Sequence, residues 1–253
     1  MRGILVTGGS RGIGRAVALA FARGGDRVAV QYAGARADAE ETVRQLPGEG
    51  HALVQADLGE PGAAEQVVAD AVAALGAVDV LVNNAAVAPT AETRHPIAQT
   101  PLADWQRIWR RMVEVNLLGA ADLSWAVANH LVGRGAGGAI VNIGSRGAFR
   151  GEPDFPAYGA TKAALHTLGQ SLAVALAPHG IAVTSVAPGF VATERQAAKL
   201  SGPDGERLRA ESPFGRVGTP EEIAAAVQFL ASPAALWASG TVVDLNGASY
   251  LRT

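Results

Sequence analysis

Apolar and polar residues form two kinds of pattern along the chain. Short, almost wholly apolar runs predict strands over residues 4–7, 27–32, 51–55, 78–83, 139–144, 181–188 and 241–245. Such runs are typical of strands that are covered on both faces of a sheet. Longer helical patterns predict helices near residues 13–24, 37–46, 61–75, 101–132, 158–177 and 220–230. This order predicts an α/β fold with a doubly wound, seven-stranded parallel sheet and helices on both faces.

Local signals support the starts of two of these helices. Thr100 precedes Pro101, so we expect Thr100 to be an N-cap, Pro101 the first helical residue and Asp104 part of the first turn. Thr219 and Glu222 have the spacing of a capping box, in which the two residues exchange hydrogen bonds. Both signals predict helices with defined first turns.

Two stretches, residues 84–99 and 189–218, show no clear element. In open parallel sheets, the loops that follow the carboxyl ends of the strands build the ligand crevice. We interpret residues 189–218, which carry Gly, Pro and mixed charge, as a mobile lid over a substrate; a solvated excursion without function is the alternative. No linker or repeat divides the chain, so residues 1–253 are predicted to form a single domain.

Composition excludes several classes of protein. With 49% apolar and 17% charged residues, the chain can bury a sizeable core and is not expected to be disordered. A net charge of −2 without a dense Lys/Arg stripe argues against nucleic acid as a partner. No apolar run reaches the roughly 18 residues of a membrane span. The first residues already predict a strand, so neither a membrane partner nor a signal peptide is expected.

Cysteine and histidine limit the chemistry further. The sequence contains no cysteine, which excludes disulfides and thiol catalysis and fits a cytoplasmic location. Its five histidines are scattered, with neither HxH nor HxxxH spacing. No metal site is therefore predicted.

Glycines follow the first predicted strand. Gly8, Gly12 and Gly14 stand between strand 4–7 and helix 13–24 in a G-x3-G-x-G spacing. Glycine permits positive φ angles and a close approach of backbone to a ligand, and a helix start offers unpaired N–H groups to phosphate. This position in a β-α-β unit predicts a cradle for the pyrophosphate of a dinucleotide; simple turn formation is the alternative.

The end of the second predicted strand bears on the choice of dinucleotide. An Asp or Glu there would bind the ribose 2′-hydroxyl of NAD and repel the 2′-phosphate of NADP. Residues 31–36 contain no carboxylate, the first being Asp38, whereas Arg11 and Arg36 flank the site. Guanidinium groups without a carboxylate favour a phosphate, so NADP is predicted in preference to NAD. The alternative is that either arginine is a plain surface residue.

Together these features resemble the short-chain dehydrogenase/reductase family over residues 3–247. The matching motifs occur in order and at the family's usual spacings: TGGSRGIG (7–14), Asp57-Leu58, NNAA (83–86), Asn116 in NLLG, Ser145, YGATK (158–162), and Pro188-Gly189 with Thr193. Within the family, the chain is most similar to the 3-oxoacyl-[acyl-carrier-protein] reductase and sugar or polyol dehydrogenase branch. The resemblance implies a Rossmann fold and an oxidoreductase.

Tyr158 and Lys162 stand four residues apart in a predicted helix, which places both on one face. Reduction of a carbonyl needs a proton donor, and a tyrosine with an ordinary pKa near 10 exchanges protons readily only when a nearby cation favours the phenolate. The resemblance implies that Tyr158 is the general acid/base. It implies that Lys162 lowers the pKa of Tyr158 and binds the nicotinamide ribose.

The resemblance adds Ser145 and Asn116 to the catalytic residues. Ser145 is expected to hydrogen-bond the substrate oxygen, with a turn or cap role as the alternative. Asn116 lies inside a long predicted helix, where asparagine is a poor helix former. It is expected to hold a local distortion and a water that links Lys162 to solvent; an interhelical hydrogen bond is the alternative.

The resemblance also implies a set of cofactor contacts. Asp57 is expected to bind the adenine, with a cap of helix 61–75 as the alternative. Asn84 and Ala85 are expected at the ribose, and the residues after the sixth strand at the nicotinamide carboxamide. The complete set is Gly8, Ser10, Arg11, Gly12, Ile13, Gly14, Tyr32, Arg36, Asp57, Leu58, Asn84, Ala85, Ala86, Tyr158, Lys162, Pro188, Gly189, Val191 and Thr193.

Three departures from the family pattern are visible. Gly144 stands where many relatives carry serine, which predicts more freedom at that strand end. The segment 146–157 is charged and aromatic, and it is expected to line the pocket with Arg146, Phe149 and Arg150. His179 replaces an arginine that acyl-carrier-protein reductases often place before strand six, which weakens the case for carrier-protein docking.

The sequence therefore predicts an NADP-dependent oxidoreductase that interconverts a ketone and a secondary alcohol. The substrate is a 3-oxoacyl thioester, a sugar or polyol, or another small carbonyl compound. The alternatives are a non-catalytic dinucleotide-sensing protein, against which the complete catalytic set argues, and a sugar-nucleotide epimerase, which typically needs a further C-terminal domain.

A homotetramer is also predicted. Apolar side chains on helices 101–132 and 158–177 exceed what one face of a sheet covers: Trp105, Trp109, Trp125, Leu165, Leu168, Leu172 and Leu176. The resemblance implies that these helices pair across a two-fold axis. The alternative is that all of these side chains face their own core.

Overall fold

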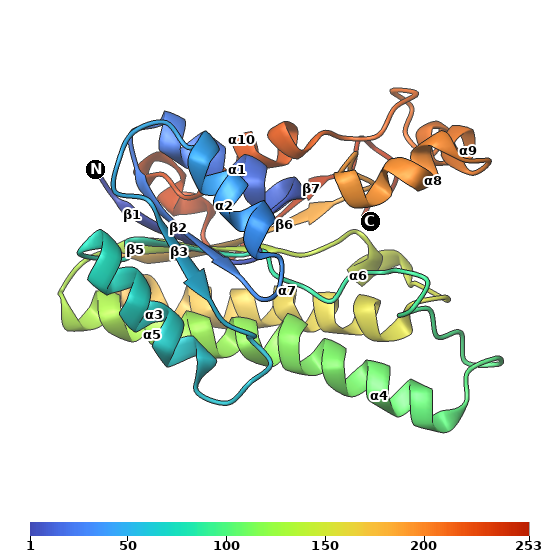
Figure 1. The fold of residues 1–253 in the computed structure, drawn as a ribbon, viewed down its shortest axis with the longest axis horizontal. Helices are drawn as coiled ribbons and strands as arrows, with labels where there is room; N and C mark the ends of the chain where they lie inside the picture. The colour runs from blue at the N-terminus through green and yellow to red at the C-terminus, as the bar shows by residue number, and fades with distance from the viewer. Residues whose placement is uncertain (253) are drawn as a thin grey trace.

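The computed structural model describes residues 1–252. Its seven strands form one parallel sheet in the order β3-β2-β1-β4-β5-β6-β7, which confirms the predicted fold class (Figure 1). The strands are β1 (Gly3–Val6), β2 (Arg27–Tyr32), β3 (Ala52–Gln55), β4 (Val80–Asn83), β5 (Gly138–Ile143), β6 (Ile181–Pro188) and β7 (Val242–Leu245). In register, Ile4 of β1 pairs with Val28 of β2 and with Val80 of β4. The strand order reverses beside β1, which is where open parallel sheets bind ligands.

Helices cover both faces of the sheet because successive strand side chains alternate in direction. Ile4 and Val6 pack on one side with α1 (Gly12–Arg23), α2 (Arg36–Gln45) and α10 (Pro220–Leu230). Leu5 packs on the other side with α3 (Ala63–Leu75), α5 (Gly119–Gly133) and α7 (Pro156–Leu176). Figure 1 shows these two layers of helices above and below the strands.

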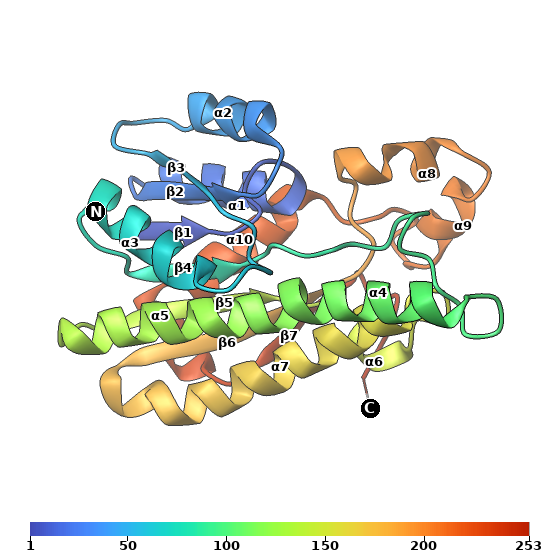
Figure 2. The ribbon, with the colours of Figure 1, turned by 60° about the horizontal axis from the view of Figure 1, so that its bottom comes forward.

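The helix predicted over 101–132 is three consecutive elements. Helix α4 (Leu102–Val113) runs into a π-helical turn, η1 (Glu114–Leu118), which leads into α5. Helix α4 packs along α7 (Figure 2). The predicted N-cap was wrong: the helix starts after Pro101, and Thr100 donates its hydroxyl to the carbonyl of Pro96 instead. The capping box of Thr219 and Glu222 is confirmed.

Of the two stretches without predicted elements, 84–99 contains neither a helix nor a strand, whereas 189–218 contains short helices. In the lid segment these are η3 (Glu194–Gln196), α8 (Ala197–Ser201) and α9 (Gly205–Ala210), so the absence of an element from 189–218 was wrong. The segment that follows β5 contains α6 (Gly147–Arg150). Two further turns, η2 (Ala177–His179) and η4 (Pro233–Ala238), precede β6 and β7. Figure 2 shows α8 and α9 at the end of the molecule to which the strands point.

Candidate active site

A cleft of about 1160 Å³ lies at the carboxyl ends of the strands. Its walls are the loops after the strands β1 to β6, together with the start of α7 and the lid segment. A ligand pocket typically occupies about 300–1,000 Å³. The cleft therefore has room for a dinucleotide and a small substrate together.

The glycine turn at one end of the cleft is tightly built. Gly8 and Gly12 have φ angles of +60° and +55°, which favour glycine. A Cβ added at Gly14 would lie 2.3 Å from the carbonyl oxygen of Gly8 and 2.5 Å from Nδ2 of Asn84. Asn84 Nδ2 donates to the carbonyls of Thr7 and Gly8, so it ties β4 to this turn. Strand and helix thus meet without intervening side chains, and the start of α1 opens into the cleft.

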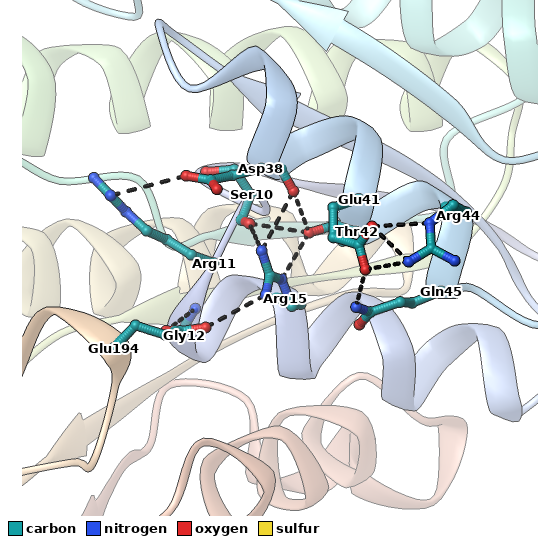
Figure 3. A network of polar contacts seen from close by, with 10 residues as sticks. All are labelled: Ser10, Arg11, Gly12, Arg15, Asp38, Glu41, Thr42, Arg44, Gln45 and Glu194. Carbon is teal, nitrogen blue, oxygen red and sulfur yellow. Dashed lines mark hydrogen bonds and ion pairs between the residues drawn. The ribbon is translucent and has the colours of Figure 1, made fainter. Parts of the chain in front are cut away.

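A carboxylate from the lid segment lies on this turn (Figure 3). The N–H of Gly12 donates to Oε2 of Glu194 over 3.0 Å, and Arg15 Nη1 lies 3.4 Å from Oε1 of Glu194. A helix N-terminus attracts anions through its free N–H groups and its dipole. The carboxylate shows that the turn accepts an anion, which is the chemistry required for the pyrophosphate of a dinucleotide.

The two arginines that were predicted to favour a 2′-phosphate lie in different places. Arg11 lines the cleft, with Nη1 4.0 Å from Oδ2 of Asp38. Arg36 does not line the cleft; its Nε donates to Glu40 over 2.8 Å, and its side chain is 68% exposed. Of these two arginines, Arg11 alone lines the cleft, and Arg36 matches its alternative as a surface residue.

Asp57 lies in the cleft but already has a strong partner. Nη2 of Arg111 contacts both of its carboxylate oxygens, at 2.8 and 2.6 Å, and the N–H of Gly59 donates to it. Partial burial works against ionisation, yet the hydrogen bond from Arg111 leaves the pKa of Asp57 below its usual value. The alternative role was wrong, because α3 starts after Gly62 and has no side-chain cap.

Tyr158, Lys162 and Ser145 meet on the floor of the cleft. Lys162 Nζ donates to the carbonyl of Ile143 over 2.7 Å and lies 5.9 Å from the centre of the Tyr158 ring. Burial lowers the pKa of Lys162 to about 8. Burial also raises the pKa of Tyr158, against a hydrogen bond with Ser145 and the charge of Arg195. Lys162 is not among the groups that shift the pKa of Tyr158, so the expected lowering of the tyrosine pKa by the lysine was wrong for the protein without a bound dinucleotide.

Asn116 occupies the π-helical turn, which provides the predicted local distortion. The side chain is 1% exposed and lies behind the cleft rather than on its wall. Its Oδ1 accepts from the N–H of Val87 over 2.7 Å, and its Nδ2 donates to Thr161 of α7 over 3.3 Å. The interhelical hydrogen bond considered as an alternative is thus present together with the distortion.

The other predicted residues converge on the same cleft. Apart from Asn116 and Arg36, every residue predicted for catalysis or cofactor contact lines it. Tyr32 lines it through a buried ring, with its hydroxyl donating to Gln55 over 3.3 Å. Positions spread over the whole sequence are therefore assembled at one edge of the sheet.

The segment after β5 differs from its prediction in two ways. Arg146 and Arg150 line the cleft, but Phe149 does not. Phe149 stacks on His166 with ring centres 5.2 Å apart, and the guanidinium of Arg252 covers it. A Cβ added at Gly144 would lie 2.0 Å from Cε1 of His166. Gly144 thus makes room for the imidazole, and the predicted freedom at this strand end was wrong.

Several residues of the site were not predicted. Gln31, a buried polar residue in an otherwise apolar strand, accepts from the N–H of Gly8 over 3.1 Å. His95 is fully buried and accepts from the N–H of Ala157, in the first turn of α7, over 3.1 Å. A polar residue within an apolar strand is a signal that could have found Gln31. His95 gave no signal, because its partner is 62 positions away.

Comparison with known proteins identifies the family. A family model described as enoyl-(acyl carrier protein) reductase matches residues 8–247. The chain belongs to the short-chain dehydrogenase/reductase family. Members of this family use nicotinamide dinucleotides, so the chain is an oxidoreductase with such a cofactor.

Individual family members align over nearly the whole chain. L-rhamnose 1-dehydrogenase (NAD(P)(+)) of Sphingomonas sp. is 37% identical over 98% of this chain and 96% of its own length. The 3-oxoacyl-[acyl-carrier-protein] reductase of Staphylococcus aureus is 34% identical over 98% and 97%. A short-chain dehydrogenase from Burkholderia cenocepacia, solved in complex with NADP, superposes with a TM-score of 0.86 at 31% identity over 98% and 97%. Within the described residues, no helix is long and apolar enough to cross a bilayer.

Proposed function

We propose that this chain is an NADP-dependent oxidoreductase that interconverts a ketone and a secondary alcohol, with Tyr158 as the general acid/base. The observation that carries the proposal is the meeting of Tyr158, Ser145 and Lys162 on the floor of the cleft. The substrate is a 3-oxoacyl thioester, a sugar or polyol, or another small carbonyl compound. Relatives named for a sugar and for a 3-oxoacyl thioester support this range.

The bound dinucleotide would donate or accept the hydride. The hydroxyl of Ser145 holds the substrate oxygen beside Tyr158, and Tyr158 gives that oxygen a proton as the carbonyl is reduced. Because burial raises the pKa of Tyr158, the residue is held in its protonated form, ready to act as an acid in the reducing direction.

Lys162 in the cleft and Asn116 behind it support this proton transfer. The Lys162 side chain is buried, and one of the N–H donors of its ammonium binds the carbonyl of Ile143. The remaining donors can hydrogen-bond the ribose hydroxyls of a dinucleotide. Asn116 fixes the loop at Val87 to α7 at Thr161, one residue before Lys162. Asn116 thereby fixes the position of Lys162 relative to the loop at Val87.

NADP is proposed in preference to NAD. Arg11 faces the cofactor end of the cleft, and residues 31–36 contain no carboxylate that would repel a 2′-phosphate. Replacing Ala33 by Asp introduces such a carboxylate at the end of β2. We expect Ala33→Asp to weaken NADPH binding; unchanged affinity for NADPH would contradict the preference.

A second candidate, a non-catalytic dinucleotide sensor, would share the fold and the cofactor cradle. The catalytic set argues against it, because a sensor has no need of Ser145 beside a buried Tyr158. A panel of ketones, sugars and 3-oxoacyl thioesters, assayed with NADPH or NADP⁺ by absorbance, separates the two. Turnover of any panel member supports the oxidoreductase, whereas cofactor binding without turnover favours the sensor.

Three further parts of the proposal concern the whole chain. The lid segment 189–218 contributes Glu194 and Arg195 to the cleft wall, and we propose that it covers the substrate. A homotetramer is proposed from exposed apolar side chains, of which Trp125 on α5 is 59% exposed. Leu165 does not contribute to this surface, because it is buried in its own core. A cytoplasmic location is proposed from the absence of cysteine in the sequence.

A further inference from the structure

The carboxylate of Glu152 lies in the wall of the cleft next to the catalytic residues. Its side chain is 21% exposed and lines the cleft after the short helix α6. A Cβ added at Gly147 would lie 2.5 Å from Oε1 of Glu152, and one added at Gly159 would lie 3.6 Å from Cβ of Glu152. Gly147 makes the space for this carboxylate, whereas 3.6 Å at Gly159 is an ordinary contact; because Gly159 directly follows Tyr158, this contact places Glu152 beside the helical turn of the proposed proton donor.

This carboxylate has hydrogen-bonding capacity that the described residues 1–252 do not use. An ionised carboxylate accepts about four hydrogen bonds, yet none to the side chain of Glu152 is present. Its nearest cation is Arg150, whose Nε lies 3.8 Å from Oε1, beyond hydrogen-bond distance. Because this side chain lines the cleft, its unused acceptor capacity is available to a bound substrate.

Arg150 also has hydrogen-bonding capacity that residues 1–252 do not use. Its guanidinium lies 3.8 Å from Glu152 and 3.6 Å from Glu211, and over residues 1–252 its side chain donates no hydrogen bond. Neighbouring charges differ: Arg146 donates to Glu211 and to Ser249, so its guanidinium is held within the protein. Glu152 and Arg150 thus offer an acceptor and a donor to the cleft, with no net charge between them.

We propose that Glu152 and Arg150 select a polyhydroxylated, uncharged substrate, a sugar or polyol, whose hydroxyl groups donate to Glu152 and accept from Arg150. This inference rests on the proposed oxidoreductase function and narrows its substrate. A hydroxyl group is both donor and acceptor, so neighbouring hydroxyls satisfy both side chains. An acyl chain would leave both groups unpaired, and a carboxylate on the substrate could pair with Arg150 but would supply no donor to Glu152.

The test compares four probes in steady-state assays: a panel of aldoses and polyols with NADP⁺, cyclohexanol with NADP⁺, and acetoacetyl coenzyme A and a 2-oxo acid with NADPH. We expect the best sugar or polyol to exceed the others by about 100-fold or more in kcat/KM, since a site built to bind hydroxyls strongly rejects analogues without them. Glu152→Gln should lower kcat/KM for the sugar or polyol about 10- to 100-fold, mainly through KM. With cyclohexanol the loss in kcat/KM should be at least about fivefold smaller than with the sugar or polyol, because no hydroxyl contact to Glu152 is lost.

Control measurements distinguish a loss of substrate recognition by Glu152 from misfolding and from failure of the proposed oxidoreductase function. Glu65→Gln, an exposed carboxylate in the first turn of α3, should leave all four rates unchanged. NADPH binding by fluorescence should be retained in Glu152→Gln. Faster turnover of acetoacetyl coenzyme A, the 2-oxo acid or cyclohexanol, or an equal loss by Glu152→Gln on every probe, overturns the substrate class while the oxidoreductase stands. No turnover of any probe overturns the proposed function itself.

Discussion

At the residue scale, His166 shows how a buried group shapes the active site without touching the reaction. The ring is 3% exposed, stacks on Phe149 and fills the space beside Gly144. Both of its nitrogens lack a hydrogen-bond partner among the described residues. Burial lowers the pKa of His166 to about 4, so the imidazole is neutral in the folded protein near neutral pH.

His166 should make stability depend on pH. The unfolded chain gains a proton at the imidazole near pH 6.5, whereas the folded chain resists it down to about 4. Above pH 6.5 the imidazole is neutral in both states and costs no stability. As the pH falls from 6.5 toward 4, the free energy of unfolding decreases by about 1.4 kcal/mol per pH unit, up to about 3 kcal/mol in total. Denaturant titrations at several pH values should show a smaller loss in His166→Phe and an unchanged loss in His179→Gln, which alters an exposed histidine. Parallel curves for wild type and His166→Phe would contradict this.

Arg11 should carry the preference for NADP. Loss of a charge-assisted contact costs about 1.5–3 kcal/mol, so Arg11→Ala should weaken NADPH binding roughly 10- to 100-fold. NADH binding should change little, because NADH has no 2′-phosphate. Fluorescence titrations measure both affinities. Arg36→Ala is the matched control, since Arg36 is paired with Glu40 outside the cleft. Equal losses for NADPH and NADH in Arg11→Ala would show a general role instead.

At the element scale, the strands were predicted to within two residues of their bounds, because apolar runs between glycine-rich turns mark buried strands. The break in helix 101–132 was implied by the family resemblance at Asn116, but its π-helical form could not be predicted. That form depends on the hydrogen bonds of Asn116 to Val87 and Thr161, which are 29 and 45 positions away. Helical periodicity reports local pattern only, and tertiary contacts decide where it is interrupted.

His95 should hold the first turn of α7, which carries Tyr158. Its ring nitrogens contact the carbonyl of Thr93 at 2.6 Å and the N–H of Ala157 at 3.1 Å, and the ring packs edge-on against Trp105. His95→Ala removes a fully buried ring and leaves that N–H unpaired, so we expect a loss of about 2–4 kcal/mol in the free energy of unfolding.

Denaturant unfolding of His95→Ala measures this loss, and a lower turnover should accompany it because Tyr158 is displaced. Gln99→Ala, at an exposed position of the same loop, should unfold like the wild type. A His95→Ala protein with wild-type stability and turnover would show that the contact does not hold the helix.

At the scale of the whole molecule, nearly all residues predicted to contact a cofactor line the cleft, whereas the contacts of the segment after β5 were not predicted. The former residues belong to motifs with fixed spacing, and parallel strands bring their carboxyl ends to one edge. The segment after β5 depends on ion pairs such as those of Arg146 and Arg150 with Glu211, more than 60 positions apart. No sequence pattern predicts such contacts, because they depend on how the lid segment packs against α6.

The exposed apolar surface predicts association. Trp125 on α5, Val174 on α7 and Trp237 on η4 are 59%, 80% and 99% exposed. Large exposed apolar side chains mark interaction surfaces, so we expect a homotetramer with about four times the chain mass of 25.8 kDa. Light scattering at micromolar concentration measures this mass. Trp125→Glu should reduce it, and a monomeric mass for the wild type would contradict the prediction.

The measurement that tests the central claim most directly is turnover by Tyr158→Phe with the best substrate from the panel. Removing one hydroxyl from a buried ring deletes the proposed proton donor and leaves the cleft otherwise intact. General acid catalysis contributes about 10²–10⁴-fold, so kcat should fall by at least about 100-fold while the affinity for NADPH stays within about threefold. Turnover by Tyr158→Phe close to that of the wild type would contradict the role of Tyr158 as the acid/base.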